Sequence, residues 1–334
     1  MNMTKQAPRI LLSEHTAREL APQLTEIFGP GGYTQITASD IHAGTADADI
    51  CFVSREITGN STKQNILPDT QYFYDALRAS KTLRWIQVHS AGADRQVFLD
   101  LIARGVTLTT SSGASASLVA QTALTGLLSL SRRFPQLAAA QRAHIWAPFF
   151  KTGLPPDLEG QTALIVGWGP IGQKLGAWLG ALGLNIIVVR QSAQSSVEGA
   201  RVIGFSDFAT NLPQADWLVL ACPLTTQTTN LVSEYALSLM KPSAHIINIS
   251  RGAVIDEPAM IDALTNGRLA GAYLDVFAQE PLAAESPLWD LPNVIATPHT
   301  AGFSDGILQR MSQMFIQNLK NWQADTPLFN VVNK

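Results

Sequence analysis

Short hydrophobic runs of four to six residues alternate along this chain with longer amphipathic segments. Such runs are typical of strands buried on both faces, and the longer segments are typical of helices. The pattern predicts strands at residues 9–12, 50–53, 85–88, 106–109, 163–166, 185–189, 217–222, 245–249, 271–276 and 294–297. It predicts helices at 17–27, 72–79, 115–132, 135–144, 173–182 and 304–324. Strands that alternate with helices indicate an α/β protein with doubly wound parallel sheets.

Composition narrows the class of protein. The 334 residues suggest about two domains, and 46% hydrophobic residues are ample for packed cores. A net charge of -3 without a Lys/Arg cluster argues against a nucleic-acid partner or an anionic membrane surface. Cys51 and Cys222 lie in or beside apolar runs, so we expect buried thiols and a reducing compartment. The N-terminus lacks an apolar signal core, and no run is long enough to span a bilayer, so we expect a cytoplasmic protein.

A glycine motif lies between a predicted strand and a predicted helix. Gly167 permits a tight turn, Gly169 lets the backbone approach a pyrophosphate, and Gly172 lets the helix pack close to the sheet. A second strand at 185–189 completes a βαβ unit, the context that distinguishes this motif from an ordinary glycine-rich turn. The motif predicts a dinucleotide site formed by Gly167, Gly169, Pro170, Ile171 and Gly172.

The residue that closes the second strand bears on the choice of cofactor. An NAD site uses Asp or Glu about 20 residues after the glycines to bind the ribose hydroxyls. Here Arg190 stands eighteen residues after Gly172, followed by Gln191 and Ser192. A guanidinium can bind a 2′-phosphate through two hydrogen bonds, and no carboxylate stands there to repel it. The pattern favours NADP(H), with NAD(H) possible; the alternative is a solvated arginine at a strand end.

Reactive side chains follow three successive predicted strands. Arg251, Glu280 and His299 lie where ligands collect in open α/β sheets, beyond the carboxyl ends of the strands. A carbonyl that accepts a hydride becomes an alkoxide, so a charged donor stabilises its transition state more than its ground state. A neighbouring carboxylate stabilises a protonated imidazole. The three residues therefore suit an anion clamp, an orienting acid and a proton donor, although each alone could be structural. No metal site is expected.

Between residues 90 and 302 the chain resembles the D-isomer-specific 2-hydroxyacid dehydrogenase family. This family contains glyoxylate/hydroxypyruvate reductases, D-lactate dehydrogenases and phosphoglycerate dehydrogenases. The first 80 residues resemble it only in pattern. The matching stretches are 90–94, 105–124, 167–172, 223–225 with Thr228, 248–252 with 255–257, 271–277, 280–282 and 298–299.

The resemblance implies two Rossmann-like doubly wound domains with the active site in the cleft between them. Residues 1–111 and 303–334 would form the substrate-binding domain, residues 112–302 the dinucleotide-binding domain, and two chains a homodimer. Arg251 would bind the carboxylate and carbonyl of a 2-oxo acid, Glu280 would hydrogen-bond His299, and His299 would protonate the carbonyl oxygen.

The same resemblance implies further contacts. The backbone amides of Ala91 and Gly92 would hold the substrate carboxylate, and Asp275 would meet the nicotinamide carboxamide. The other implied cofactor contacts are Cys222, Pro223, Thr228, Ile249, His299 and Gly302. The chain departs from the family at Arg190, and at Gln121, where the family commonly has Glu.

Two residues bear on which side chain the substrate carries. Arg55 follows a strand of the first domain and could favour a polar or anionic tail, or be a solvated loop residue. Trp146 resembles an aromatic residue found near the partner's cleft in glyoxylate/hydroxypyruvate reductases, or could pack at a dimer interface.

We therefore expect an NADP(H)-preferring reductase that converts small 2-oxo acids, such as glyoxylate or hydroxypyruvate, to D-2-hydroxy acids. The alternatives are an NAD-dependent D-2-hydroxyacid dehydrogenase and an NAD(H)-sensing binding protein of the corepressor type. A formate dehydrogenase-like enzyme is disfavoured because that branch pairs its histidine with Gln, whereas this chain has Glu280.

Overall fold

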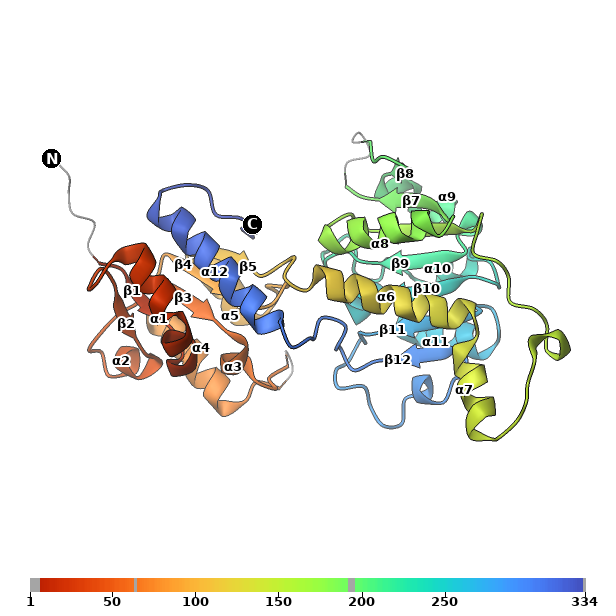
Figure 1. The fold of residues 1–334 in the computed structure, drawn as a ribbon, viewed down its shortest axis with the longest axis horizontal. Coiled ribbons are helices and arrows are strands. Elements are labelled where there is room, and N and C mark those ends of the chain that lie inside the picture. The colour runs from red at the N-terminus through yellow and green to blue at the C-terminus, as the bar shows by residue number, and fades with distance from the viewer. Residues whose placement is uncertain (1–6, 63–64, 192–195, 333–334) are drawn as a thin grey trace. The chain divides into compact units, whose positions relative to one another are not determined.

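The computed structural model describes residues 7–62, 65–191 and 196–332. The chain forms two units, of which unit 1 is Met1–Ala114 with Ser304–Lys334 and unit 2 is Ser115–Phe303. The sequence places the corresponding boundaries at 111/112 and 302/303. Each unit is built around its own parallel sheet (Figure 1).

Unit 1 contains a five-stranded sheet in the order β2-β1-β3-β4-β5, with every pair of neighbouring strands parallel. This is the flavodoxin-like doubly wound order. The strands are β1 (Arg9–Leu11), β2 (Thr34–Ile36), β3 (Ile50–Val53), β4 (Trp85–Val88) and β5 (Thr107–Thr110). The helices are α1 (Glu14–Phe28), α2 (Ala38–His42), α3 (Arg55–Thr58), α4 (Pro68–Ala79), α5 (Gln96–Ala103) and α12 (Ile307–Gln323).

Alternate residues of each strand in unit 1 pack on opposite faces of the sheet. Ile50 and Phe52 pack with α1 and α12, whereas Cys51 and Val53 pack with α4 and α5. Helices therefore cover both faces, which is why β3 is apolar throughout. Phe315 of α12 stacks on Phe52 with ring centroids 4.7 Å apart, so the last helix belongs to the core of the N-terminal sheet (Figure 1).

Unit 2 contains a seven-stranded parallel sheet in the order β12-β11-β10-β9-β6-β7-β8. The strand order reverses between β6 and β9, the position at which dinucleotides bind in such sheets. The strands are β6 (Thr162–Val166), β7 (Asn185–Val189), β8 (Ala200–Ile203), β9 (Trp217–Leu220), β10 (His245–Asn248), β11 (Gly271–Leu274) and β12 (Val294–Ala296). The helices are α6 (Ala116–Ser131), α7 (Phe134–Arg142), α8 (Pro170–Ala181), α9 (Phe208–Asn211), α10 (Glu234–Ser238) and α11 (Glu257–Thr265).

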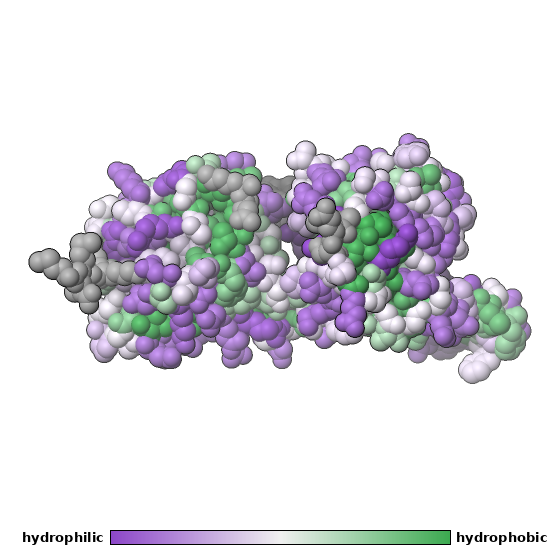
Figure 2. All heavy atoms as spheres, turned by 90° about the horizontal axis from the view of Figure 1, so that it is seen from above, coloured by the Kyte–Doolittle hydropathy of each residue, from purple (hydrophilic) through white to green (hydrophobic). Residues whose placement is uncertain are grey.

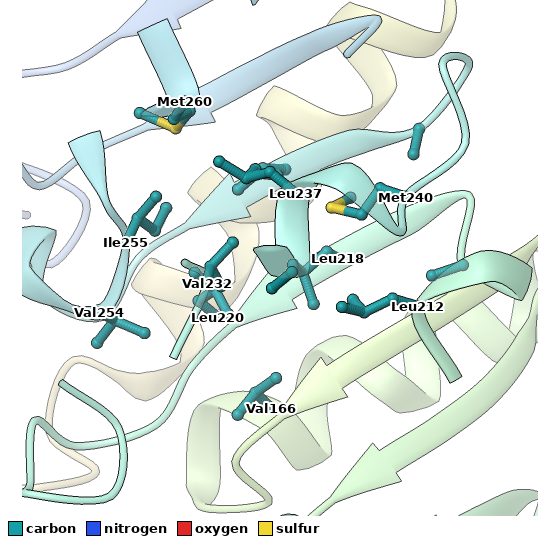
Figure 3. Close-up of a cluster of buried hydrophobic side chains, with 14 of the residues drawn as sticks. Val166, Leu212, Leu218, Leu220, Val232, Leu237, Met240, Val254, Ile255 and Met260 are labelled. Carbon is teal, nitrogen blue, oxygen red and sulfur yellow. The ribbon is translucent and has the colours of Figure 1, made fainter. Parts of the chain in front are cut away.

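Two apolar clusters cover the two faces of the unit 2 sheet. Helices α6 and α8 cover one face, where they pack on Val219 and Ile247. Helices α10 and α11 cover the other face, where Met240 and Met260 close a cluster around Leu218 and the neighbouring strand residues (Figure 3). This double burial explains the continuous hydrophobic runs of the central strands.

The α/β class with two doubly wound sheets is confirmed, and so is the burial of both cysteines. Two strands, β2 and β8, were not expected from the sequence. Both lie at sheet edges and leave part of their side chains exposed, so they lack a continuous apolar run. The short helices α2, α3, α5, α9, α10 and α11 were also not expected. Among the described residues, no helix is both long and apolar enough to cross a membrane.

Candidate active site

The glycine motif forms a tight connection between β6 and α8. Gly167 has φ 97°, and a Cβ there would lie 2.7 Å from the carbonyl oxygen of Ala221. A Cβ at Gly172 would lie 2.2 Å from the carbonyl oxygen of Gly167, so the first turn of α8 packs directly on the loop. A Cβ at Gly169 would meet nothing within 4 Å. The open space at Gly169, beside the N-terminus of α8, fits a dinucleotide pyrophosphate.

Trp168 holds this loop against its own helix. A Cβ at Gly176 would lie 2.4 Å from the Trp168 ring, so the indole packs where α8 has no side chain. The side-chain amide of Gln173 also donates to the carbonyl oxygen of Trp168 at 3.0 Å. Pro170 and Ile171 form the first turn of α8 between these contacts. The loop conformation is therefore set by packing as well as by its glycines.

Arg190 directly follows β7, at the carboxyl edge of the sheet. Its backbone N–H donates to the carbonyl oxygen of Ile203 at 3.1 Å, which fixes the point where its side chain leaves the sheet. The side chain is partly exposed, and Gln191 beside it is exposed. Ser192 lies outside the described residues.

His299 and Glu280 form the pair that the sequence predicts. His299 Nδ1 lies 2.7 Å from Glu280 Oε2, and the histidine side chain is 49% exposed. Burial by itself would raise the pKa of Glu280, but the hydrogen bond and charge of His299, the Phe277 amide and the charge of Arg251 hold that pKa below its usual range. Glu280 is thus an ionised acceptor at neutral pH, which leaves the other ring nitrogen of His299 for a ligand.

Arg251 lies in the loop after β10, next to the loop that carries Glu280. A Cβ at Gly252 would lie 1.8 Å from the carbonyl carbon of Phe277, so the two loops touch along their backbones. Arg251 Nη1 donates to the carbonyl oxygen of Ser250 at 2.7 Å. The structure therefore brings Arg251, Glu280 and His299 together at the carboxyl ends of three adjacent strands, β10, β11 and β12.

Asp275 anchors the loop that carries His299. Its carboxylate is buried and accepts hydrogen bonds from Thr297 Oγ1 at 2.6 Å, from the Thr300 amide at 2.9 Å and from the Ala301 amide at 3.0 Å. Hydrogen-bond donors that precede and follow His299 in the sequence thus bind the Asp275 carboxylate. Sequence reasoning assigned Asp275 to the cofactor and missed this anchoring. The proximity of Thr297 to His299 in the sequence was the available signal.

The other expected cofactor residues lie near the same edge of the sheet. Cys222 and Ile249 are buried just after β9 and β10, and burial raises the pKa of the Cys222 thiol to about 11. The Thr228 hydroxyl donates to the carbonyl oxygen of Pro223 at 2.7 Å, so it closes the loop after β9. A Cβ at Gly302 would lie 3.2 Å from Ser115, which keeps this loop against the start of α6.

In unit 1 the residues expected to contact substrate lie at the carboxyl ends of β3 and β4. Ser90 Oγ donates to the carbonyl oxygen of Gly92 at 2.6 Å and closes a turn. Within the described residues, the amides of Ala91 and Gly92 donate no hydrogen bond. Arg55 is the first residue of α3 and is half-buried; burial and then the charge of Arg95 lower its pKa.

His89 lies near Arg55 in the same unit. Burial, followed by the charges of Arg55 and Arg95, lowers the pKa of His89 to about 3, although the charge of Glu56 opposes the shift. His89 Nε2 lies 2.9 Å from Thr58 Oγ1. The imidazole is therefore neutral at physiological pH.

Trp146 lies in an exposed segment of unit 2. The segment that follows α7 is the extension at the right of Figure 1, and Figure 2 shows apolar surface on it. Trp146 is 92% exposed, and four other large apolar side chains of α7 and the segment after it are exposed as well. They are Phe134, Ile145, Phe150 and Leu154. Such a concentration of exposed apolar side chains is unusual for a surface that faces only water.

Comparison with known proteins agrees with this geometry. The family model for the D-isomer specific 2-hydroxyacid dehydrogenase, NAD binding domain, matches residues 124–301. The chain is 35% identical over 252 residues to the glyoxylate/hydroxypyruvate reductase B of Pectobacterium carotovorum subsp. carotovorum (strain PC1), with 73% of this chain and 77% of the relative covered.

Solved structures extend the likeness to the whole chain. A D-isomer specific 2-hydroxyacid dehydrogenase family protein from Aeromonas salmonicida subsp. salmonicida A449 is 28% identical, with a TM-score of 0.77 over 98% of this chain and 99% of that one. A D-isomer specific 2-hydroxyacid dehydrogenase from Xanthobacter autotrophicus Py2, solved in complex with NADPH and MES, has the same fold at 24% identity, with a TM-score of 0.76 and 98% of each chain covered.

The fold, the glycine loop and these matches define an oxidoreductase that uses a nicotinamide dinucleotide and acts on a CH–OH group. More narrowly, the chain belongs to the D-isomer specific 2-hydroxyacid dehydrogenase family.

Proposed function

We propose that this protein is an NADP(H)-preferring reductase that converts small 2-oxo acids to D-2-hydroxy acids, with glyoxylate and hydroxypyruvate as its substrates. The observation that carries the proposal is the 2.7 Å pair of His299 and Glu280, with Arg251 on the adjoining loop, on the same sheet as the glycine loop. The name of the relative from Pectobacterium supports the choice of substrates.

His299 acts as the general acid in the proposed mechanism. Its Nδ1–H donates to ionised Glu280, so the proton on Nε2 is directed at the substrate carbonyl oxygen. A bound nicotinamide supplies the hydride. Negative charge grows on the carbonyl oxygen as the reaction proceeds, and a cationic imidazole beside it stabilises that charge. In the oxidative direction the same residue acts as the base.

Arg251 binds the carboxylate of the 2-oxo acid. A guanidinium offers two parallel N–H donors, which match the two oxygens of a carboxylate and orient the adjacent carbonyl. The amides of Ala91 and Gly92 supply further donors to the carboxylate, because within the described residues they donate no other hydrogen bond. Arg55 contacts a polar or anionic tail, since its charge lies at the carboxyl edge of its sheet.

Arg190 determines the preference for NADP(H) in this proposal, with Gln191 and Ser192 beside it. A cation at the end of β7 attracts the 2′-phosphate, whereas a carboxylate at this position would repel it. The structure from Xanthobacter, which has the same fold, holds NADPH, and this is consistent with the proposal. Cys222, Pro223, Thr228, Ile249, Asp275 and Gly302 complete the proposed cofactor contacts.

Two chains form a homodimer through the exposed segment that contains α7 and Trp146. Five large apolar side chains are exposed between residues 134 and 154. Association with the same segment of a second copy would bury them, and apolar burial is the main driving force of such interfaces. We further propose that the protein works in the cytoplasm, because both thiols are free and buried.

The direct test is an assay of purified protein with a panel of 2-oxo acids and with NADPH or NADH, followed by the loss of cofactor absorbance. We expect glyoxylate and hydroxypyruvate to be the best substrates and NADPH the better cofactor. Failure to reduce any 2-oxo acid would overturn the proposed function, and better use of NADH would overturn the cofactor assignment alone.

Replacing Arg190 tests the cofactor assignment more sharply. Arg190→Asp should change the ratio of kcat/KM for NADPH over NADH by about two orders of magnitude, because it removes about 1.5 to 3 kcal/mol of charged hydrogen bonding and adds repulsion. Arg201→Gln is the matched control, since Arg201 lies within β8 and its guanidinium donates to Asn211. An unchanged ratio in Arg190→Asp would place the phosphate elsewhere.

A further inference from the structure

Tyr273 connects helix α6 with the loop that carries His299. The tyrosine is buried on β11, and its ring packs against α6 at Gly126, where a Cβ would lie 2.4 Å from the ring. Its hydroxyl lies 2.8 Å from Thr297 Oγ1, and Thr297 Oγ1 lies 2.6 Å from Asp275 Oδ1. Three side chains thus form a continuous path of hydrogen bonds from the interior of unit 2 to the Asp275 carboxylate.

The chemistry of the groups determines the direction of these hydrogen bonds. A carboxylate only accepts, so the single hydroxyl proton of Thr297 is donated to Asp275. The oxygen of Thr297 is then the acceptor for the hydroxyl proton of Tyr273. Burial, reinforced by the charge of Asp275 and opposed by the hydrogen bond to Thr297, raises the pKa of Tyr273 to about 12. The tyrosine therefore remains a donor throughout the neutral range.

Hydrogen bonds to Asp275 and Thr297 hold the backbone around His299. His299 has φ 50°, a left-handed conformation that a residue with a side chain rarely adopts and that costs free energy. Surrounding contacts must compensate for that cost. The amide of His299 donates to the carbonyl oxygens of Asp275 and Thr297, both at 2.9 Å. The side chain of Asp275 binds Thr297 before the histidine and Thr300 after it.

We propose that Tyr273 is a positioning residue for the reaction: through Thr297 it holds the Asp275 carboxylate in the orientation that fixes the His299 backbone. The inference rests on the proposed role of His299 as proton donor. Tyr273 touches neither His299 nor Glu280 in the described hydrogen bonds, so it acts only through the path. A loss of its hydroxyl lets Thr297 and then the carboxylate reorient.

The test compares Tyr273→Phe, Thr297→Val and Thr297→Ser with Tyr235→Phe, a control on an exposed tyrosine of the same unit. Tyr273→Phe keeps the ring against Gly126 and removes only the hydroxyl. We expect kcat to fall about three- to tenfold in Tyr273→Phe and Thr297→Val, the range of one neutral hydrogen bond. The pH profile of kcat should also shift in these two variants. Thr297→Ser keeps the hydroxyl, so its kcat and pH profile should stay close to those of the wild type.

Two further measurements separate positioning from packing. The double variant Tyr273→Phe/Thr297→Val should be no slower than Thr297→Val alone, because both changes break one path. Spectra of protein labelled with ¹⁵N-histidine, assigned with the help of His299→Ala, should show shifted His299 ring resonances in Tyr273→Phe and not in Tyr235→Phe.

The inference is overturned if Tyr273→Phe lowers the melting temperature while kcat, the pH profile and the His299 resonances stay unchanged. Additive losses in the double variant would also overturn it. Both results leave the proposed function standing, because the panel of 2-oxo acids tests that separately. Full activity in His299→Ala would overturn the proposed role of His299, and the inference with it.

Discussion

Two histidines lie at the carboxyl ends of parallel strands, His299 after β12 in unit 2 and His89 after β4 in unit 1. His299 is exposed and bound through Nδ1 to a carboxylate whose pKa is lowered. His89 is packed among cationic side chains, and its pKa is lowered to about 3, first by burial and then by the charges of Arg55 and Arg95. Two histidines at similar places on their sheets therefore have very different surroundings. The proposed role of His299 as an acid depends on the charge and solvent access around its ring.

Removing the two rings gives the largest expected difference. His299→Ala should lower kcat by about 10²- to 10⁴-fold with little change in the dissociation constant of NADPH, because only general acid catalysis is lost. His89→Gln, which keeps a hydrogen-bond donor for Thr58, should lower kcat less than about tenfold. Steady-state kinetics and a binding titration measure both. A similar loss of kcat in the two variants would contradict the distinction drawn between the rings.

The arginines beside the two histidines provide the next comparison. Arg251→Lys should lower kcat/KM about ten- to hundredfold for every 2-oxo acid, because an ammonium cannot form the two parallel hydrogen bonds to a carboxylate. The matched variant Arg55→Lys keeps the charge and should change kcat/KM much less. Wild-type kinetics in Arg251→Lys would place Arg251 outside the site.

Arg55→Ala should have a smaller and selective effect. We expect kcat/KM to fall about tenfold for 2-oxo acids with a hydroxyl or a second carboxylate, since these lose a charge-assisted hydrogen bond. Substrates with a simple apolar tail should be spared, because Arg251 still binds their carboxylate. The readout is the substrate panel. Equal loss across that panel, or none, would show that Arg55 does not contact the tail.

The smallest effect concerns stability and pH. Unfolded His89 takes up a proton below about pH 6.5, whereas the folded protein resists this until about pH 3. The unfolded state therefore binds more protons in this window, and the free energy of unfolding falls as the pH falls, by at most about 1.4 kcal/mol per pH unit.

His89→Gln isolates this contribution. Urea unfolding between pH 7 and pH 5 should show a weaker pH dependence in His89→Gln than in the wild type. The carboxylates with lowered pKa values, Glu280 among them, lose their own contribution at lower pH, but they do so equally in both proteins. Equal pH dependence of the two proteins would mean that His89 is protonated in the folded state.

The amino-acid sequence was enough to predict the strands that are buried on both faces. β3, β4 and β7 have the bounds that the sequence predicts, because strands covered by helices on both sides are mostly apolar. It was also enough to predict the glycine loop and the place of Arg251, Glu280 and His299 after three successive strands. Residues at the ends of neighbouring parallel strands must lie at one edge of a sheet.

The surroundings of each of these residues became clear only from the folded structure. The edge strands β2 and β8 have no apolar run, since water replaces part of their packing. The path from Tyr273 to Asp275 joins strands that are adjacent in the sheet but separated in sequence by a loop with a short 3₁₀ helix. His89 lies only two residues from Ala91, yet its neutral state depends on Arg55 and Arg95 from other segments. Electric fields and burial depend on distances in space, which spacing along a chain does not specify.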